Sequence, residues 1–487
     1  MDSANHLPDD IHRLAYHIMA PANWINDPNG LVQYKGEYHV FYQHHPDSPK
    51  WGPMHWGHVK SKDLVHWERL SIALAPSEAY DRDGCFSGSA VVDDHGVLTL
   101  IYTGNIWMKE DQSELKQYQC AATSTDGVTF VKDPANPVIA EPPFDCCGHI
   151  RDPKVWKHED QWYMILGTRE GNHGKVVLYR SKDLRSWNYI GIAAESDGTL
   201  GYMWECPDLF RLNGKDVLVF SPQGIEPQGD KYNNLHQTGY LVGNLDYQTG
   251  KFQHGGFEEL DKGFDFYAAQ TFHDEQGRRI LIAWMDMWES YMPTQTKGWG
   301  GALTIPRLLE LTPENKLLMK PVPELELLRK EHDHAQSIEV TPLQSDYLSH
   351  IKGDCLEIVA EFSLAACDAS EFGIKVRCSE DYTEETVIRF DVNDSAVIFD
   401  RTRSGIGEEG IRRAFLDVSG KKSIKFHLFV DRSSVELFVN DGELAMTGRI
   451  YPNSSSNKVD IFAEGGCVQV LSWNSWKLKD IWIEARK

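Results

Sequence analysis

Short segments in which apolar and polar residues alternate dominate the first two thirds of the chain. YHVFYQ, LTLIYTG and WYMILGTR each have the pattern of a half-buried β-strand, and little amphipathic helix lies between them. A related motif follows each strand: SKDLVHW at Ser61–Trp67, STDGVTF at Ser124–Phe130 and SKDLRSW at Ser181–Trp187. In each copy an Asp can hydrogen-bond its own backbone in a turn before an aromatic residue returns to the core. The pattern predicts a repeated β-unit of roughly 60 residues.

Two further segments extend the repeat to about five units. Gly243–Phe252 (GNLDYQTGKF) is a weaker copy of the turn motif, and Arg278–Asp286 (RRILIAWMD) supplies another strand without it. Such β-units at a regular interval predict a β-propeller of four-stranded blades around a central axis. Because the interval is longer than in the commonest propeller repeats, one large irregular β-sandwich is the alternative.

The pattern changes in the last third of the chain. Leu327–Asp346 is rich in charged and polar residues, and we expect it to carry a short linker helix. Beyond it, short alternating segments and the hairpin signal Asn440-Asp441-Gly442 are typical of a β-sandwich. We therefore expect an all-β protein with a five-bladed propeller at residues 1–330, a linker at 331–350 and a β-sandwich at 351–487.

Composition excludes several classes of partner. A chain of 487 residues is long enough for two or more domains. Its net charge of -23 argues against binding to nucleic acid or to an anionic membrane, and no apolar run is long enough to span a bilayer. The beginning of the chain lacks the basic and apolar segments of a signal peptide, so we expect a cytoplasmic protein; secretion is the alternative if a leader has been removed. Oligomeric state is left open.

No cofactor or metal is expected from the sequence. The nine cysteines are irregularly spaced and contain no CxxC pair, which predicts reduced thiols rather than disulfides or a zinc site. There is no Gly-rich phosphate loop and no nicotinamide fingerprint. The histidines near the beginning of the chain have no metal-ligand spacing, and we expect core or surface roles for them: His44, His45, His55, His58 and His66.

Three carboxylates are candidates for chemistry: Asp27 in WINDPNG, Asp152 in IRDPKVW and Glu205 in MWECPDLF. Glycoside hydrolysis with retention needs a nucleophile and an acid/base from such a set, and the inner strands of different blades would bring them together at the axis. Each also has a simpler interpretation. Asp27-Pro28-Asn29-Gly30 alone is a turn signal, Asp152 could form a surface ion pair, and Glu205 could be a solvent-side residue.

The full series of motifs resembles glycoside hydrolase family 32, which contains invertases, inulinases and sucrose-6-phosphate hydrolases. The resemblance covers almost the whole chain, in the order WINDPNG, WGPMHWGH, FSGS, RDPKVW, ECPDLF, FDFYAAQTF, GWGGALTIPR and FVDRSSVELFVNDG. It implies a five-bladed propeller followed by a β-sandwich. It also implies a retaining β-fructofuranosidase that cleaves the fructosyl bond of sucrose or sucrose 6-phosphate through a covalent fructosyl-enzyme.

The resemblance assigns roles to the three carboxylates. Asp27 would be the nucleophile, Glu205 the general acid/base with a raised pKa, and Asp152 a stabiliser of the transition state that grips fructose hydroxyls. If Glu205 is not the acid/base, the nearby Asp208 becomes the candidate. Cys206 would either influence the surroundings of Glu205 or simply pack as a small buried residue.

The resemblance also predicts a fructose pocket, in which polar side chains bond the hydroxyls and aromatic rings cover the sugar carbons. Arg151 would keep the neighbouring Asp152 ionised. The predicted pocket residues are Trp24, Asn26, Gln43, Trp51, Phe86, Ser87, Arg151, Tyr267 and Trp299.

Other activities are compatible with the same motifs. A fructosyltransferase would use the same covalent intermediate and pass fructose to a sugar, and a fructan hydrolase would accept longer fructosides. A non-catalytic fructan-binding protein is disfavoured, because all three carboxylates are present. The substrate is in each case a small sugar, and the sequence does not separate sucrose from sucrose 6-phosphate.

Overall fold

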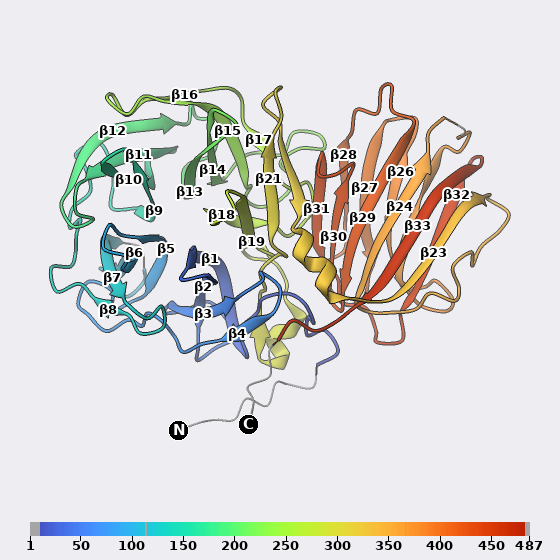
Figure 1. Cartoon of the computed structure of the whole chain (residues 1–487), viewed down its shortest axis with the longest axis horizontal. Coiled ribbons are helices and arrows are strands. Elements are labelled where there is room, and N and C mark those ends of the chain that lie inside the picture. The colour runs from blue at the N-terminus through green and yellow to red at the C-terminus, as the bar shows by residue number, and fades with distance from the viewer. Residues whose placement is uncertain (1–9, 113, 366, 483–487) are drawn as a thin grey trace.

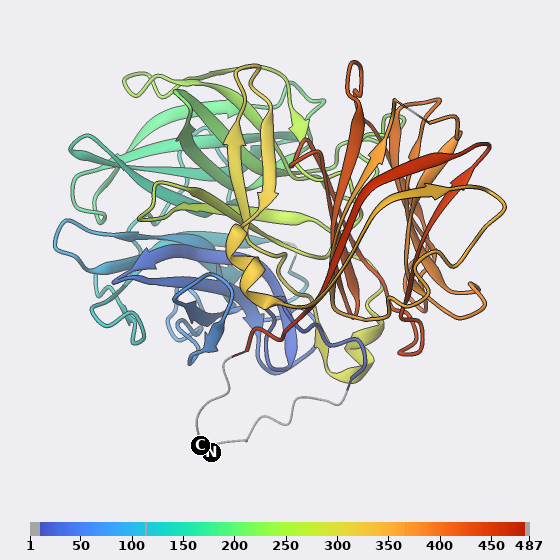
Figure 2. The same cartoon turned by 45° about the vertical axis from the view of Figure 1, so that its right-hand side comes forward.

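The computed structural model describes residues 10–112, 114–365 and 367–482, and these form two β-domains that lie side by side (Figures 1 and 2). Five antiparallel sheets, one after another along the chain, surround a common axis (Figure 1). In chain order, their strands are β1 (Asn23–Tyr34), β2 (Glu37–His45), β3 (His55–Ser61) and β4 (Trp67–Arg69); β5 (Cys85–Val92), β6 (Leu98–Trp107), β7 (Leu115–Ser124) and β8 (Val131–Lys132); β9 (Ile150–His158), β10 (Gln161–Glu170), β11 (His173–Ser181) and β12 (Trp187–Glu195); β13 (Met203–Leu212), β14 (Lys215–Gln223), β15 (Gly239–Leu245), β16 (Phe252–His254) and β17 (Glu258–Glu259); and β18 (Tyr267–His273), β19 (Arg279–Trp284), β21 (Arg307–Leu311) and β22 (Leu317–Pro321).

The first strand of each sheet is its innermost strand. These five strands contact one another in a closed ring, in the order β1, β5, β9, β13 and β18, and β18 returns to β1. This ring confirms the five-bladed propeller predicted from the repeat.

The repeated turn motif joins the third and fourth strands of the first three blades. In each copy one Asp Oδ1 accepts hydrogen bonds from the backbone N–H groups two and three residues later, at 2.7–3.1 Å; the residues are Asp63, Asp126 and Asp183. The weaker copy behaves similarly, since Asp246 accepts from the backbone of Gln248 and Thr249. The periodicity in the sequence therefore reflects one local turn repeated from blade to blade.

The last blade is tied to the first by the chain between β19 and β21. After the 3-10 helix η1 (Pro293–Lys297), the two-residue strand β20 (Trp299–Gly300) pairs in parallel with β1, with Trp299 opposite Asn23. The end of the described chain also returns to the first blade, where Trp482 pairs with Trp67 and lies against the guanidinium of Arg69. These contacts fix the first blade from two sides.

The second domain is a sandwich of two antiparallel sheets around a buried apolar core. The hairpin between its strands β30 (Ser434–Val439) and β31 (Leu444–Arg449) has Asn440 at φ 48° and Asp441 at φ 61°, as the hairpin signal predicts. In spatial order, one sheet contains β23 (Arg329–Val340), β33 (Val468–Leu478), β24 (Leu356–Ser363), β29 (Ser423–Asp431), β30 (Ser434–Val439) and β31 (Leu444–Arg449), and the other contains β28 (Ile411–Phe415), β27 (Ala396–Arg403), β26 (Glu385–Asp391), β25 (Glu371–Cys378) and β32 (Lys458–Glu464).

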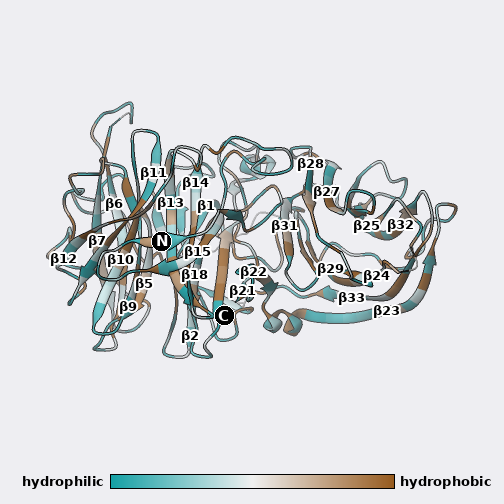
Figure 3. Cartoon of the chain, turned by 90° about the horizontal axis from the view of Figure 1, so that it is seen from above, coloured by the Kyte–Doolittle hydropathy of each residue, from teal (hydrophilic) through white to brown (hydrophobic). Residues whose placement is uncertain are grey.

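The predicted linker helix is wrong. Residues 329–340 form β23, an edge strand that pairs only with β33 in its sheet, and the 3-10 helix η2 (Pro323–Leu328) precedes it. Most side chains of β23 are exposed, and Figure 3 draws the strand largely in hydrophilic colours. An edge strand with both faces partly in solvent has the polar composition of a linker, which explains the error. The boundaries at residues 330 and 350 remain predictions.

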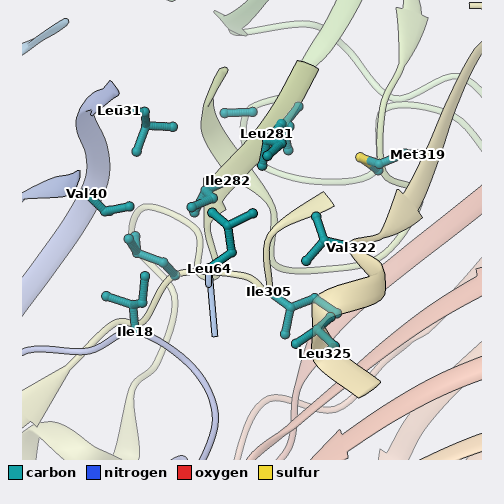
Figure 4. Close-up of a cluster of buried hydrophobic side chains, with 14 of the residues drawn as sticks. Ile18, Leu31, Val40, Leu64, Leu281, Ile282, Ile305, Met319, Val322 and Leu325 are labelled. Atoms are coloured by element: carbon teal, nitrogen blue, oxygen red, sulfur yellow. The ribbon is translucent and has the colours of Figure 1, made fainter. Parts of the chain in front are cut away.

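An apolar cluster fills the space beside the propeller where the sandwich docks. Figure 4 shows this cluster extending from Leu31 and Val40 of the first blade, past Ile282 of the last blade, to Leu325 of η2. The same cluster includes Phe429 and Phe438 of the sandwich. The two domains therefore share a core.

A buried polar chain crosses the same interface. Arg307 of the propeller bonds Asp261 at 3.0 Å and also bonds Glu436 of the sandwich. Glu436 and Asp431 each lie 2.8 Å from one ring nitrogen of His17, and all these side chains are fully buried. Burial alone lowers the pKa of His17, but the hydrogen bonds to Asp431 and Glu436 raise it to about 9. Asp431 and Glu436 come from FVDRSSVELFVNDG, so this motif serves domain docking.

No helix among the described residues is long and apolar enough to cross a membrane. The five histidines named above make local contacts inside or beside the first blade. His44 bonds the carbonyl of Trp24 and His58 bonds His39, while His45, His55 and His66 bond groups within five residues. Across residues 10–112, 114–365 and 367–482, no three His, Cys, Asp or Glu side chains are grouped as metal ligands.

Candidate active site

A cavity of about 350 Å³ opens at the end of the propeller where the inner strands begin. The first blade contributes Asn26 and Asp27, and the third and fourth blades contribute Asp152 and Glu205. The three candidate carboxylates therefore meet in one cavity. Its lining residues are Asn26, Asp27, Gln43, Trp51, Phe86, Ser87, Trp107, Gln112, Leu115, Gln117, His149, Arg151, Asp152, Glu205 and Trp288.

Every inner strand is irregular where it passes the cavity. A β-bulge places an extra residue opposite the neighbouring strand and redirects a side chain. The strand register shifts at five places, between Ile25 and Pro28 on β1, Phe86 and Gly88 on β5, Arg151 and Lys154 on β9, Glu205 and Asp208 on β13, and Tyr267 and Gln270 on β18. The candidate carboxylates lie within or beside these shifts.

Asp152, which lines the cavity, and Cys206, which contacts Asp152 from behind it, have left-handed backbone conformations. Asp152 has φ 63° and Cys206 has φ 48°, which are uncommon for residues with a Cβ and are typical of functional sites. A proline follows both residues and also Asp27. Because proline has no N–H for a strand ladder, Asp-Pro and Cys-Pro inside otherwise strand-like segments were a usable sequence signal for these irregularities.

Asp27 is almost enclosed by hydrogen-bond donors. The residue is 9% exposed. Its Oδ2 accepts from Ser87 Oγ at 2.6 Å and contacts Cys206 Sγ at 3.4 Å, and its Oδ1 accepts from Asn26 Nδ2 at 3.0 Å. Burial raises the pKa of Asp27, and the charge of Glu205 adds to this, while the bonds from Ser87 and Asn26 oppose it. These donors fix the orientation of the carboxylate.

Asp152 has a strongly raised pKa. It is 4% exposed, and its Oδ2 accepts from the backbone N–H of Cys206 at 2.9 Å. Burial raises its pKa to about 7, and the charges of Glu205 and Asp27 also raise it. The charge of Arg151 acts in the expected direction and lowers the pKa, but it does not cancel the effect of burial, so Asp152 is only partly ionised near neutral pH.

Glu205 is surrounded by donors instead. Its Oε1 accepts from Arg151 Nε and Nη2 at 2.9 and 2.8 Å, and its Oε2 accepts from Gln223 Nε2 at 2.7 Å and Tyr267 OH at 2.6 Å. Although burial favours the neutral acid, the Arg151 charge and the bonds from Tyr267 and Arg151 lower the pKa of Glu205. In the free protein the pKa of Glu205 is therefore lowered, whereas the resemblance implied a raised one. The sequence did not indicate this, because these partners are distant from Glu205 along the chain.

Six of the predicted pocket residues line the cavity, and two support it from behind. Trp24 Nε1 donates to Asn26 Oδ1 at 2.7 Å, and Tyr267 reaches the site through Glu205. The lining residues that the sequence prediction missed lie mostly in loops or at strand ends, where the pattern gives no position. The six predicted residues in the lining are Asn26, Gln43, Trp51, Phe86, Ser87 and Arg151, and the six missed are Trp107, Gln112, Leu115, Gln117, His149 and Trp288.

Trp299 is not part of the cavity lining. It is 4% exposed, its Nε1 donates to Asp10 Oδ2 at 2.7 Å, and its ring packs in an apolar cluster with Leu14 and Met285. Through the pairing of β20 with β1 it supports the strand that carries Asp27. The structure gives it a supporting position rather than a sugar contact.

Cys206 and Asp208 have positions that the sequence did not predict. The thiol of Cys206 lies 3.4 Å from Asp27 and 3.7 Å from Asp152, so it contacts both carboxylates. Asp208 is fully buried outside the cavity lining, where it accepts from Lys154 Nζ at 2.8 Å and from the backbone N–H of Thr271 at 2.6 Å. This buried pair joins β9, β13 and β18 beneath the site.

Comparison with known proteins agrees with this geometry. Residues 17–321 match the glycosyl hydrolases family 32 N-terminal domain, and residues 324–477 match the family's C-terminal domain. A sucrose-6-phosphate hydrolase of Zymomonas mobilis is 43% identical over 481 residues, covering 96% of this chain and 92% of the relative. A sucrose-6-phosphate hydrolase of Bacillus subtilis is 41% identical over 465 residues, covering 94% and 92%.

Solved structures support the same assignment. A family 32 β-fructofuranosidase of Bombyx mori has a TM-score of 0.86 at 36% identity, with 98% of this chain and 96% of that chain covered. The structure of a sucrose-6-phosphate hydrolase from Lactobacillus gasseri has a TM-score of 0.87 at 29% identity, with 97% and 94% covered. Both domains, the axial cavity and the matched sequence lead to one conclusion: the chain belongs to glycoside hydrolase family 32.

Proposed function

We propose that the protein is a retaining β-fructofuranosidase that hydrolyses the fructosyl bond of sucrose or sucrose 6-phosphate. The observation that carries this proposal is the meeting of Asp27, Asp152 and Glu205 in one cavity, each with a different set of hydrogen bonds. The names of the relatives support the substrate class, as does the structure of a Bombyx mori β-fructofuranosidase variant in complex with sucrose, which is 37% identical with a TM-score of 0.85.

Asp27 is the proposed nucleophile. Ser87 and Asn26 bond its two oxygens and hold the carboxylate in one orientation. Attack of a carboxylate oxygen on the anomeric carbon of fructose breaks the bond to the leaving sugar and forms a fructosyl ester. Water then attacks the same carbon, and the carboxylate of Asp27 is released. Two displacements at one carbon give retained configuration.

Glu205 is the proposed general acid/base. It must hold a proton when the leaving sugar departs and must accept one from water in the second step. In the free protein the donors around Glu205 favour its ionised form, while Asp152 has a pKa of about 7. Fructose hydroxyls that donate to Asp152 favour the ionised form of Asp152, so substrate binding makes a proton available to Glu205.

Asp152 is the proposed stabiliser. Once ionised, its buried carboxylate faces a sugar ring that gains positive charge as the bond breaks, and this interaction strengthens from the ground state to the transition state. Its left-handed backbone and the bond from Cys206 hold the carboxylate in place before substrate arrives.

The test is the release of fructose from sucrose, sucrose 6-phosphate, raffinose and inulin by one purified preparation, with kcat/KM measured for each. We expect hydrolysis of sucrose or sucrose 6-phosphate with β-fructofuranose as the first product by NMR. Oligosaccharide products at high sucrose concentration would instead indicate fructosyl transfer. A folded preparation that releases no fructose from any of the four would refute the proposal.

We also propose a cytoplasmic location. All nine cysteines are free, and five of them are buried, which is typical of a reducing compartment. Alkylation of denatured but unreduced protein, prepared from the source cells, should modify every cysteine; modification of fewer cysteines would contradict the proposal.

A further inference from the structure

One cation beside the cavity differs from its neighbours. Three other cations close to lining residues are neutralised by carboxylates within 4.0 Å: Arg82 by Asp83, Lys109 by Glu114, and Lys116 by Glu141. Arg169 takes part in no ion pair within the described parts of the chain; its guanidinium contacts His149 and faces the ring of Tyr202. Its charge is therefore available to a ligand.

Arg169 lies at the rim of the site because of the strand pairing. It is next to the last residue of β10, which runs antiparallel to β9, and Gly167 of β10 pairs with Arg151. The Nη2 of Arg169 donates to His149 Nε2 at 3.0 Å, and His149 lines the cavity. The half-buried guanidinium is thus one imidazole ring away from the cavity.

His149 is suited to hold Arg169 in this position. Burial lowers the pKa of His149 to about 4, and the charges of Arg151 and Arg169 contribute to this, so the ring is neutral at physiological pH. A neutral ring that accepts from Arg169 through Nε2 carries its proton on Nδ1. Arg151, the arginine that lines the cavity, is bound to Glu205 and is not free for a ligand.

The position of Arg169 corresponds to the leaving-group side of the proposed reaction. Tyr202, which its guanidinium faces at 6.0 Å, lies three residues before Glu205, and Glu205 protonates the leaving sugar. A phosphate dianion on that sugar matches the planar donor fork of an arginine. In a protein with net charge -23, binding of a dianion requires such a local positive group.

We infer that Arg169, positioned by His149, binds the phosphate of a phosphorylated leaving hexose, so that sucrose 6-phosphate is preferred over sucrose. This inference rests on the proposed fructosidase function and specifies its substrate.

The experiment compares kcat/KM for sucrose 6-phosphate and sucrose in the wild type, Arg169→Gln and Arg169→Lys. The wild type should favour the phosphorylated sugar by at least about tenfold, and R169Q should lower this ratio by about 10- to 100-fold, as expected for loss of a charge-assisted bond. R169K keeps the charge but lacks the planar donor fork, so its ratio should lie between those of the wild type and R169Q.

Arg180→Gln is the matched control. Arg180 is an exposed arginine on β11 that pairs with Tyr163, at the opposite end of the same hairpin from Arg169, which pairs with Gly174. The substitution R180Q removes the same charge from the same blade, and it should leave the ratio of kcat/KM for the two substrates at the wild-type value. An equal change of the ratio in R180Q and R169Q would show a general charge effect and overturn the inference.

Product inhibition of sucrose hydrolysis gives a test on the wild type that does not depend on the folding of any variant. Glucose 6-phosphate should inhibit at least about tenfold more strongly than glucose. Equal inhibition by the two sugars, or inhibition by inorganic phosphate as strong as by glucose 6-phosphate, would overturn the inference. Equal kcat/KM for the two substrates would overturn it while leaving the proposed function intact. No release of fructose from either substrate would refute the proposed function, and the inference would fall with it.

Discussion

Replacement of Asp152 by Asn should abolish turnover and, above neutral pH, stabilise the protein. Burial raises the pKa of Asp152 from 3.8 to about 7, whereas in the unfolded chain the group ionises near its ordinary value. Between these two pH values the folded protein binds the extra proton, so the wild type loses stability as pH rises through this range. Asn has no charge at any pH and avoids this loss.

The magnitude follows from the shift. The pKa shift of about three units, at roughly 1.4 kcal/mol each, costs the wild type at most about 4 kcal/mol of folding stability above pH 8. At pH 4.5 the cost is about 1 kcal/mol, and D152N should regain it in each case. Asn can still accept the bond from the Cys206 backbone, so little is lost in exchange. With an unfolding entropy of about 2.1 cal/mol/K per residue, 1 kcal/mol corresponds to about 1 °C for a chain of this length. The Tm of D152N should therefore exceed that of the wild type by up to about 4 °C at pH 8, and by about 1 °C at pH 4.5.

Differential scanning calorimetry at the two pH values, with one scan rate, measures this difference. The control is Asp183→Asn, in the exposed turn where hydrogen bonds lower the pKa of Asp183 although partial burial opposes this; it should not raise the Tm at pH 8. An equal Tm change for D152N at both pH values, or a lower Tm at pH 8, would refute the electrostatic argument. Wild-type turnover in D152N would refute the assigned role.

Three further substitutions test the remaining parts of the site. Asp27→Ala should reduce kcat to below about a thousandth of the wild-type value while the fold persists, because it removes the carboxylate that forms the ester in the proposed mechanism. Folded protein with more than a tenth of wild-type activity, measured by fructose release, would exclude Asp27 as nucleophile. Glu205→Gln should slow the hydrolysis of sucrose about 10²-fold or more, but should leave nearly unchanged the hydrolysis of a fructoside whose leaving group departs without a proton. Added azide should give fructosyl azide of retained configuration. Equal losses of activity on good and poor leaving groups would exclude Glu205 as the acid/base. Lys154→Met should lower the free energy of unfolding by about 3–5 kcal/mol, measured as a lower Tm, because it leaves the buried Asp208 unpaired. The double variant K154M/D208L should recover part of this loss. A Tm unchanged in K154M would contradict this role for the pair.

The features that the sequence predicts best are those set by local interactions. The turns after the third strands depend on one Asp and the backbone two and three residues later, so their spacing is visible in the sequence. The hairpin at Asn440 and Asp441 is equally local. The resemblance to the family supplied the roles of the three carboxylates and agreed with the number of blades that the repeat predicts.

The features that the sequence did not predict depend on distant partners. The pKa of Glu205 is lowered by Arg151 and Tyr267, which are 54 and 62 residues away, and no pattern along the chain connects them. Trp299 has the aromatic character of a sugar-binding residue, but its place is set by the pairing of β20 with β1. The strand β23 is polar because it lies at an edge, and edge position is a property of the whole sheet.

The docking of the two domains makes the propeller dependent on its neighbour. In a truncated chain that ends after the propeller, Arg307 would lose its partner Glu436, and His17 would lose both of its carboxylate partners. The apolar cluster of Figure 4 would also be exposed to water. The sandwich therefore does not behave as a detachable module that a gene fusion could exchange for another. Any recombination between relatives at this junction has to transfer the partners of Arg307 and His17 together, so the two halves of the gene are expected to be inherited as one unit.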